Sequence, residues 1–328
     1  MAALPDLDHL LDAAHVVVLP MRVKFRGVLE RELLLLDGPA GWAEFGPFVE
    51  YDDEESSRWL AAAIEAGWEG FPEPLRQWIP VNATVPAVPA SDVAAVLASF
   101  DSVHTVKIKV AERGQELADD LARVAAVRAA LPDAAIRIDA NGGWTVPEAV
   151  DALRALAPYV LEYAEQPVPS IDGLAQVRRD VAGLGILIAA DESVRKATDP
   201  LAVARAGAAD LIIVKAAPLG GVRRALEIVA QAGLPAVVSS ALDSSVGIRA
   251  GIALAAALPQ LPYACGLGTV ALMAGDVVEE SLVALDGGIT VRDVAADPHL
   301  LVRYAAPAER TVWWRERLAR CHRVLAAG

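Results

Sequence analysis

The chain of 328 residues has few of the residues that mark several classes of protein. It has only two cysteines, Cys265 and Cys321, and their spacing matches no metal-binding or redox motif. Its 29 basic residues are outnumbered by 43 acidic ones. The resulting formal charge of −14 argues against binding to nucleic acid or to an anionic membrane surface.

Long hydrophobic runs are missing too. The longest, near residues 250–258, stops at Pro259 and is far too short to cross a bilayer. The N-terminal segment carries acidic residues and no basic lead, so it does not resemble a signal peptide. These absences predict a reduced, cytosolic protein that binds neither nucleic acid nor membrane. Whether it is a monomer or a homo-oligomer stays open.

Apolar residues, by contrast, are abundant. They make up 55% of the chain, and the mean hydropathy is positive, which indicates a well-buried core rather than disorder. At this length one large barrel and a smaller second domain can both form.

Five strand-like segments in the middle of the chain each end on charged residues, and they recur at intervals of 24 to 30 residues. That interval is the length of one strand, one helix and two short loops. Parallel strands built from such units place their C-terminal ends side by side. The segments are HTVKIKV with Lys107 and Lys109, AAIRIDANGG with Asp139, LEYAEQP with Glu165, LIAADES with Asp191, and LIIVKAAP with Lys215.

From Thr84 to Thr269 the pattern predicts eight strands and seven intervening helical segments, from PVNATVPA to YACGLGT. A helix of about ten to fifteen residues is expected after each of the middle strands. Within this region Thr145 could cap a helix that has Pro147 in its first turn. The strands are rich in Ile, Val and Leu on both faces, as buried parallel strands are. Functional residues on five successive strands favour a closed barrel, while an open doubly wound sheet is the competing architecture.

The two ends of the chain differ from this middle region. Residues 1–83 carry a predicted strand pair over 21–46 and a helix near residues 54–66, and residues 270–328 end in a basic helix over 311–326. We expect the two ends to form one α+β domain that packs against the mouth of the barrel formed by residues 84–269. Arg26 is a candidate contact from this domain to a ligand, with a solvated arginine as the alternative.

Asp139, Glu165 and Asp191 offer oxygen ligands only, which select a hard cation. The predicted cofactor is therefore Mg²⁺, or Mn²⁺ in its place. The alternative for each acid is a structural one, in which it caps the following helix or lies in a polar loop.

Lys107 and Lys109 are one residue apart, so on a strand both point to the same face. If Ile108 packs against the outer helices, both lysines enter the barrel. Two ammonium groups near a dication each favour loss of a proton, and an amine then becomes a usable base near neutral pH. A solvated pair on an exposed strand is the alternative.

Lys215 ends an apolar strand, where a lysine is costly to bury unless it faces a cavity. It could otherwise snorkel to solvent or form a Schiff base, although the carboxylates have no obvious role in that chemistry. Ser239 and Ser240 could bind a substrate carboxylate or simply be polar residues at a strand end. Gly220 and Gly221 open a helix that could hold an anion, with a plain turn as the alternative.

In combination these motifs resemble the enolase superfamily, on its two-lysine, muconate cycloisomerase-like branch. The resemblance covers essentially the whole chain. It implies an α+β capping domain on a modified (β/α)₇β barrel of the TIM type. It assigns the three acids to Mg²⁺ and makes Lys109 and Lys215 acid/base groups on opposite faces of the substrate. The matching motifs are K-x-K (Lys107, Lys109), D-A-N (Asp139, Asn141), E-Q-P (Glu165), A-D-E-S (Asp191, Glu192) and the later Lys215.

Within this branch, the stretches S-S-A-L-D-S-S-V-G (239–247) and G-L-G-T (266–269) are most similar to the o-succinylbenzoate synthase family of menaquinone biosynthesis. That likeness implies a lyase acting on a small carboxylate, 2-succinyl-6-hydroxy-2,4-cyclohexadiene-1-carboxylate. Removal of a proton alpha to the carboxylate gives a metal-stabilised enediolate, and syn-dehydration then gives o-succinylbenzoate. Residues expected near the substrate or behind the metal ligands are Lys107, Asn141, Glu192, Ser239, Ser240 and Gly266.

The alternatives use the same scaffold. An N-succinylamino-acid racemase, or another cycloisomerase or epimerase of the branch, would exchange protons between Lys109 and Lys215. The D-x-D motif of dipeptide epimerases has no counterpart here, since the stretch reads Gly266-Leu267-Gly268. A histidine base is disfavoured, because four histidines lie near the chain ends and His104 begins its strand. A barrel without catalysis predicts losses among the acids and lysines, and all five are present.

Overall fold

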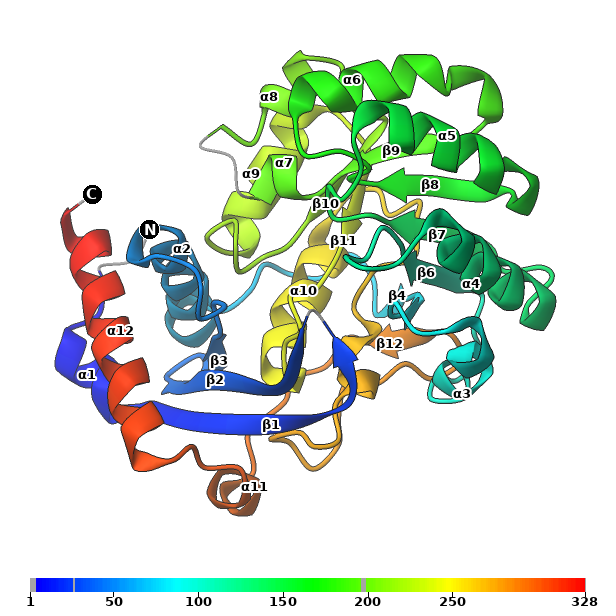
Figure 1. Cartoon of the computed structure of the whole chain (residues 1–328). Helices are drawn as coiled ribbons and strands as arrows, with labels where there is room; N and C mark the ends of the chain where they lie inside the picture. The colour runs from blue at the N-terminus through cyan, green and yellow to red at the C-terminus, as the bar shows by residue number, and fades with distance from the viewer. Residues whose placement is uncertain (1–3, 26, 196–198, 328) are drawn as a thin grey trace.

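The computed structural model describes residues 4–25, 27–195 and 199–327, so Arg26 lies outside the described residues. At its centre is a seven-stranded parallel sheet, in which the strands follow one another in chain order (Figure 1). The strands are β5 (Ala83–Val85), β6 (Thr105–Lys109), β7 (Ala135–Asp139), β8 (Leu161–Glu165), β9 (Leu187–Ala190), β10 (Leu211–Val214) and β11 (Ala236–Val238).

The two edges of this sheet are joined through the segment around Cys265. On one side, the Cys265 amide donates to the carbonyl of Pro80 at 2.7 Å, and the Asn82 amide donates to the carbonyl of Cys265 at 2.9 Å. On the other side, the Gly266 amide donates to the carbonyl of Val238 at 2.8 Å. The sheet is therefore closed into a barrel, and the open-sheet alternative is wrong.

The predicted eighth strand is much shorter than expected. Only Cys265 and Gly266 form bridges, to Val81 and Ser239, and a 3₁₀ helix, η5 (Gly268–Leu272), follows at once. Gly266 is needed at this point, because a Cβ there would lie 2.6 Å from the Ser239 hydroxyl. The chain thus closes the barrel through a close backbone approach rather than a regular strand.

Helices follow the strands, and those after β6, β7, β8 and β10 have the expected length of ten to fifteen residues. In α5 the Thr145 hydroxyl caps the first turn and Glu148 bonds back to the Thr145 amide, so the predicted cap is confirmed. The helices are η2 (Ala90–Asp92), α3 (Val93–Leu97), α4 (Leu117–Ala130), α5 (Val146–Leu156), η3 (Ala157–Tyr159), α6 (Ile171–Asp180), η4 (Ala182–Leu184), α7 (Glu192–Arg195), α8 (Ala202–Arg205), α9 (Val222–Ala232) and α10 (Ser245–Ala257). After β9 the expected long helix is wrong, since two one-turn helices, α7 and α8, stand there.

A second, antiparallel sheet lies beside the barrel and is formed by β1 (Ala14–Phe25), β2 (Val28–Gly38) and β3 (Gly41–Phe45). It has three strands rather than the predicted pair, because the apolar segment from His15 to Leu19 also pairs with β2. Helix α2 (Asp53–Ile64) continues as a π-helix, η1 (Glu65–Glu69), and packs against the C-terminal helix α12 (Ala308–Ala327) (Figure 1). We call this layer the cap.

The remaining elements connect the cap and barrel. Strands β4 (Trp78–Pro80) and β12 (Gly288–Thr290) pair antiparallel, and the short helices α1 (Leu7–Asp12) and α11 (Pro298–Arg303) lie near the chain ends. No helix within the described ranges has the length and apolar character needed to cross a bilayer. The domain boundaries at 83/84 and 269/270 and the cytosolic location stay predictions.

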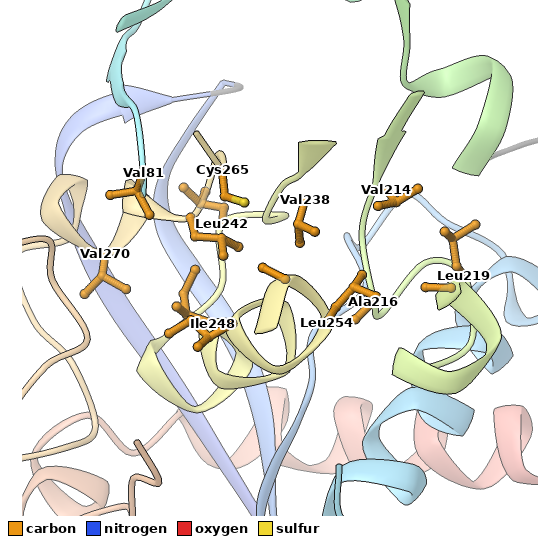
Figure 2. Packing of buried hydrophobic residues seen from close by; sticks show 14 of the residues in the cluster. Val81, Val214, Ala216, Leu219, Val238, Leu242, Ile248, Leu254, Cys265 and Val270 are labelled. Carbon is orange, nitrogen blue, oxygen red and sulfur yellow. The ribbon is translucent and has the colours of Figure 1, made fainter. Parts of the chain in front are cut away.

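The buried residues divide between the outside and the inside of the barrel. Val214 and Val238 belong to the main core, together with Ile248 and Leu254 of α10 (Figure 2). Their chain neighbours Ile213 and Val237 belong to a separate cluster with Tyr163, Ala189 and Leu211, which fills the barrel interior. This alternation along β10 and β11 decides which side chains reach the rim.

Candidate active site

The same alternation holds around the ring and carries the charged residues inward. In β6, Val106 and Ile108 are fully buried in the outer core, so Lys107 and Lys109 lie on the inner face, as predicted. Ile136 and Ile138 of β7 likewise pack outward and leave Asp139 inside. The other inward residues at strand ends are Glu165, Asp191, Lys215 and Ser239.

Strand register then places these residues in one row. Lys109 is the cross-strand partner of Asp139, and Asp139 is the partner of Glu165. Glu165 pairs with Ala189, two residues before Asp191 on the same face. The structure therefore brings the predicted acids and lysines together at the C-terminal rim of the barrel.

Direct contacts link the lysines to the acids. Lys107 Nζ lies 3.1 Å from Asp139 Oδ2 and 3.1 Å from both carboxylate oxygens of Glu165. Lys109 Nζ donates to Asp139 Oδ2 and to Asn141 Oδ1, both at 2.6 Å. Lys215 Nζ donates to Asp191 Oδ2 at 2.6 Å. Every one of the three acids thus has an ammonium partner.

These contacts shift the carboxyl pKa values in different directions. Burial opposes ionisation of Asp139, but the charges of Lys109 and Lys107 outweigh it and hold the pKa of Asp139 far below its usual range. Burial also opposes ionisation of Asp191, and Lys215 and Arg195 reverse the effect, lowering its pKa to about 2. Burial and the charge of Asp139 raise the pKa of Glu165 to about 8. At Glu165, burial and the charge of the neighbouring acid therefore outweigh the contact with the Lys107 ammonium group.

The lysines do not behave alike. Burial lowers the pKa of Lys107, but Glu165 and Asp139 more than compensate, so its pKa lies well above the usual value. Lys107 sits between these two carboxylates, and the expectation that a lysine beside a dication readily loses a proton stays a prediction. For Lys215, burial dominates over the attraction of Asp191, and its pKa is lowered.

The donor set fits a divalent cation in its chemistry. Asp139, Glu165 and Asp191 are each only 1% exposed, and they provide oxygen atoms alone. A dication would also relieve the crowding that raises the pKa of Glu165. In the part of the chain that the structure describes, no group of three or more His, Cys, Asp or Glu side chains is arranged to hold an ion, and the lysine ammonium groups lie between the acids instead.

A cavity of about 820 Å³ opens above this row and is large enough for a small organic ligand. Its barrel side is lined by all the predicted site residues except Glu165: Lys107, Lys109, Asp139, Asn141, Asp191, Glu192, Lys215, Ser239, Ser240 and Gly266. The cap contributes Val23, Lys24, Gly27, Phe48, Tyr51 and Trp59.

Three aromatic side chains of the cap form one wall of the cavity. The ring centroid of Tyr51 lies 5.6 Å from that of Phe48 and 6.3 Å from that of Trp59. The Trp59 Nε1 group is buried and has no hydrogen-bond partner among the described residues. No sequence pattern predicts this wall, because its members come from a loop and a helix outside the barrel.

Ser239 and Ser240 hold the closing segment of the barrel. The Ser240 hydroxyl donates to the carbonyl of Gly266 at 2.9 Å and lies 2.8 Å from the Thr269 hydroxyl. The Ser239 hydroxyl reaches the same carbonyl at 3.5 Å. Both serines also line the cavity, so their predicted contact with a substrate stays a prediction.

Sequence reasoning missed the polar links between the cap and the barrel, including those of Arg195 and Glu65. Arg195 in α7 contacts Asp191, Glu192 and the hydroxyl of Tyr51. At the opening of α9, the carboxylate of Glu65 accepts from the amides of Val222 and Arg223. The glycine-opened helix does hold an anion, but the anion belongs to the chain itself.

Comparisons with known proteins agree with this architecture. A family described as enolase C-terminal domain-like matches residues 91–296, and one described as enolase N-terminal domain-like matches residues 16–67. The chain is 54% identical to an o-succinylbenzoate synthase of Mycolicibacterium smegmatis over 98% of both chains. It is 52% identical to that of Mycobacterium marinum, over 99% of this chain and 97% of the relative, and 52% identical to that of Mycobacterium tuberculosis, over 98% and 97%.

Solved structures of lower sequence identity share the fold. The muconate lactonizing enzyme from Pseudomonas putida superposes with a TM-score of 0.74 at 19% identity, covering 89% of this chain and 98% of that one. The muconate lactonizing enzyme from Pseudomonas fluorescens, complexed with muconolactone, gives a TM-score of 0.76 at 20% identity, with the same coverage.

Proposed function

The chain belongs to the enolase superfamily, and we propose that it acts as an o-succinylbenzoate synthase in menaquinone biosynthesis. The observation that carries this is the identity of 52–54% to such synthases over nearly the full length of the chain. As a hydro-lyase it would convert 2-succinyl-6-hydroxy-2,4-cyclohexadiene-1-carboxylate into o-succinylbenzoate and water.

We assign Asp139, Glu165 and Asp191 to hold Mg²⁺, with Mn²⁺ as a substitute. A bound dication would supply positive charge to the substrate carboxylate as negative charge develops there. The burial of all three acids and the raised pKa of Glu165 support this assignment.

We assign Lys109 as the base that takes the proton alpha to the carboxylate. The C–H bond breaks and its electron pair enters the enediolate. Those electrons then expel the hydroxyl group from the neighbouring carbon, and Lys109 returns the proton so that water leaves from the same face. Asn141 accepts from Lys109 Nζ at 2.6 Å and so orients the amine. Aromatisation of the ring supplies driving force.

Lys215 has a different part in this proposal. Its ammonium group, next to Asp191, faces the intermediate from the other side and stabilises the developing negative charge. The aromatic wall of Phe48, Tyr51 and Trp59 gives the substrate ring an apolar contact and limits the access of water.

Racemisation of N-succinylamino acids is a second candidate. The observation that favours it is that Lys109 and Lys215 line the same cavity while each contacts a different carboxylate. Two such amines could remove and return an alpha proton from opposite faces.

The absorbance of the aromatic product tests the first proposal directly. The purified protein with Mg²⁺ should form o-succinylbenzoate, and Lys109→Ala should lower the rate by at least about 100-fold, the usual minimum for loss of a positioned base. Arg154→Ala, which removes an exposed cation from α5, serves as the control and should keep the wild-type rate. Full activity of Lys109→Ala would eliminate the proposed base.

An exchange experiment separates the two candidates. Each substrate is incubated with the protein in deuterated water. If the alpha proton of an N-succinylamino acid exchanges and no dehydration occurs, the synthase proposal is wrong and racemisation takes its place.

A further inference from the structure

Arg195 ends the one-turn helix α7 and uses three nitrogen atoms to reach three different side chains. Nε donates to Asp191 Oδ1 at 3.1 Å, Nη2 donates to Glu192 Oε1 at 2.7 Å, and Nη1 lies 3.4 Å from the Tyr51 hydroxyl. The arginine side chain is only 4% exposed, yet it lines the cavity. A buried guanidinium is costly unless its hydrogen bonds are well matched, and here each arm has an acceptor.

Two chains of hydrogen bonds run from Arg195 to the catalytic lysines. The first passes through Asp191, whose other oxygen, Oδ2, accepts from Lys215 Nζ at 2.6 Å. The second passes through Glu192 Oε1, which also accepts from Asn141 Nδ2 at 3.1 Å. Asn141 in turn accepts from Lys109 Nζ. One guanidinium is therefore linked to both proposed acid/base groups.

The third arm of Arg195 reaches the cap. Tyr51 belongs to the aromatic wall and lies 144 positions before Arg195 in the sequence. Helix α7 has only four described residues, so its own backbone bonds give it little stability. Gln166 Oε1 holds its start by accepting from the amides of Asp191 and Ser193, while Arg195 bonds to the carboxylates of Asp191 and Glu192 themselves.

We propose that Arg195 is a positioning residue that sets the carboxylates of Asp191 and Glu192, and through them Lys215 and Lys109, against the aromatic wall of the cap. This inference depends on the proposed function of the same site. Lysine cannot substitute for it, because one ammonium group on a flexible stem does not reproduce the planar fork of the guanidinium.

The test compares Arg195→Lys with wild type and with Arg128→Lys. Arg128 also donates to three acceptors, the carbonyls of Pro132, Ala134 and Tyr159, and does not line the cavity. We expect Arg195→Lys to lower kcat by about 10- to 100-fold, the usual cost of losing a partner that orients a metal ligand. KM should change little, and Arg128→Lys should match wild type.

A binding measurement and a rescue exclude a merely structural role. Titration calorimetry of Mn²⁺ should show affinity lowered about 10-fold or more in Arg195→Lys and unchanged in Arg128→Lys. Added methylguanidinium, which can enter through the cavity, should restore part of the kcat lost in Arg195→Ala.

The link to Tyr51 has its own test. Tyr51→Phe should lower kcat by about 2- to 10-fold in the wild-type background, as expected for loss of one hydrogen bond, and should have no further effect in Arg195→Lys. If the two substitutions lower kcat independently, so that their effects multiply in the double variant, the link between Arg195 and the cap is wrong.

A kcat and a Mn²⁺ affinity of Arg195→Lys both within twofold of wild type would overturn the positioning role. If the wild-type protein does not dehydrate the substrate, the proposed function fails instead, and the Mn²⁺ titration still decides the role of Arg195.

Discussion

Glu65 should be one of the strongest links between cap and barrel. It lies in η1 with 7% of its surface exposed, and its carboxylate accepts from the amides of Val222 and Arg223 in the first turn of α9. Arg223 Nη1 adds a third donor at 2.9 Å. A carboxylate at this position satisfies two amides that have no partner within the helix and interacts favourably with the helix dipole.

The expected loss of stability follows from these contacts. Glu65→Ala leaves the buried Val222 amide and the partly buried Arg223 amide unpaired, and a hydrogen bond to a charged group contributes about 1.5–3 kcal/mol. We therefore expect the free energy of unfolding to fall by about 3–5 kcal/mol. Glu65→Gln keeps one acceptor oxygen and should lose about 1–2 kcal/mol. Glu227→Ala, which removes an exposed ion pair of the same helix, should change it by less than about 1 kcal/mol.

Gly221 supplies a second, steric test of the same contact. A Cβ at Gly221 would lie 2.0 Å from Glu65 Oε2, whereas a Cβ at Gly220 would meet nothing within 4 Å. Both glycines have positive φ angles, +124° and +91°, so the backbone strain of an alanine is present at each. Gly221→Ala should therefore destabilise the protein more than Gly220→Ala, and the excess should shrink once Glu65 is also replaced by alanine.

Urea unfolding, followed by circular dichroism, measures all these variants under one condition. The reasoning is refuted if Glu65→Ala costs less than about 1 kcal/mol, the value of an exposed pair. It is refuted as well if Gly221→Ala lowers the free energy of unfolding more than Gly220→Ala by the same amount in the Glu65→Ala background as in wild type.

Three further predictions concern the site and its surroundings. Removal of divalent ions by a chelator should abolish dehydration, and Mg²⁺ or Mn²⁺ should restore it; an undiminished rate after chelation would contradict the metal assignment. Lys215→Ala should lower kcat by about 100-fold or more, and a wild-type kcat would remove Lys215 from the mechanism. Burial and the charge of Asp243, opposed by Arg31, raise the pKa of Glu44 to about 8, so its folded-state pKa exceeds the unfolded value of 4.5. The free energy of unfolding should then fall by up to about 5 kcal/mol as the pH rises from about 4.5 to 8. In unfolding experiments at pH 5 and pH 9, Glu44→Gln should lose less stability between the two pH values than wild type. An equal loss in both proteins would rule the effect out.

Much of the barrel and its charged rim can be predicted from sequence because two local rules suffice. Alternation along a strand places Lys107 and Lys109 on the face opposite Ile108, and Ile108 is fully buried in the outer core. The regular spacing of strands then puts Asp139 beside Glu165. Both rules use neighbours in the chain or in the next repeat, so they work without knowledge of distant contacts.

Local rules fail where the backbone leaves regular geometry. The segment YACGLGT has the composition of a strand, yet it pairs only at Cys265 and Gly266 because it turns at once into η5. After Asp191 the sequence predicts a helix of ten to fifteen residues, but the described residues form two one-turn helices, and Arg195 in the first of them contacts three partners with its side chain. In both places tertiary contacts outweigh local propensity.

The links between cap and barrel are the least predictable part, and they share one arrangement. Three consecutive loops of the barrel each receive a polar link from the cap: Arg195 after β9 meets Tyr51, α9 after β10 meets Glu65, and Ser244 after β11 donates to Glu44 at 3.0 Å. The partners are 144 to 200 positions apart in the sequence. No local pattern marks such a pair, because each member alone has the features of an ordinary surface residue.

Since these loops follow the strands that lead to Asp191, Lys215 and Ser239, the cap is fixed to the half of the rim that carries them. A change at any one of the three links should therefore alter the geometry of the site as well as the stability of the fold.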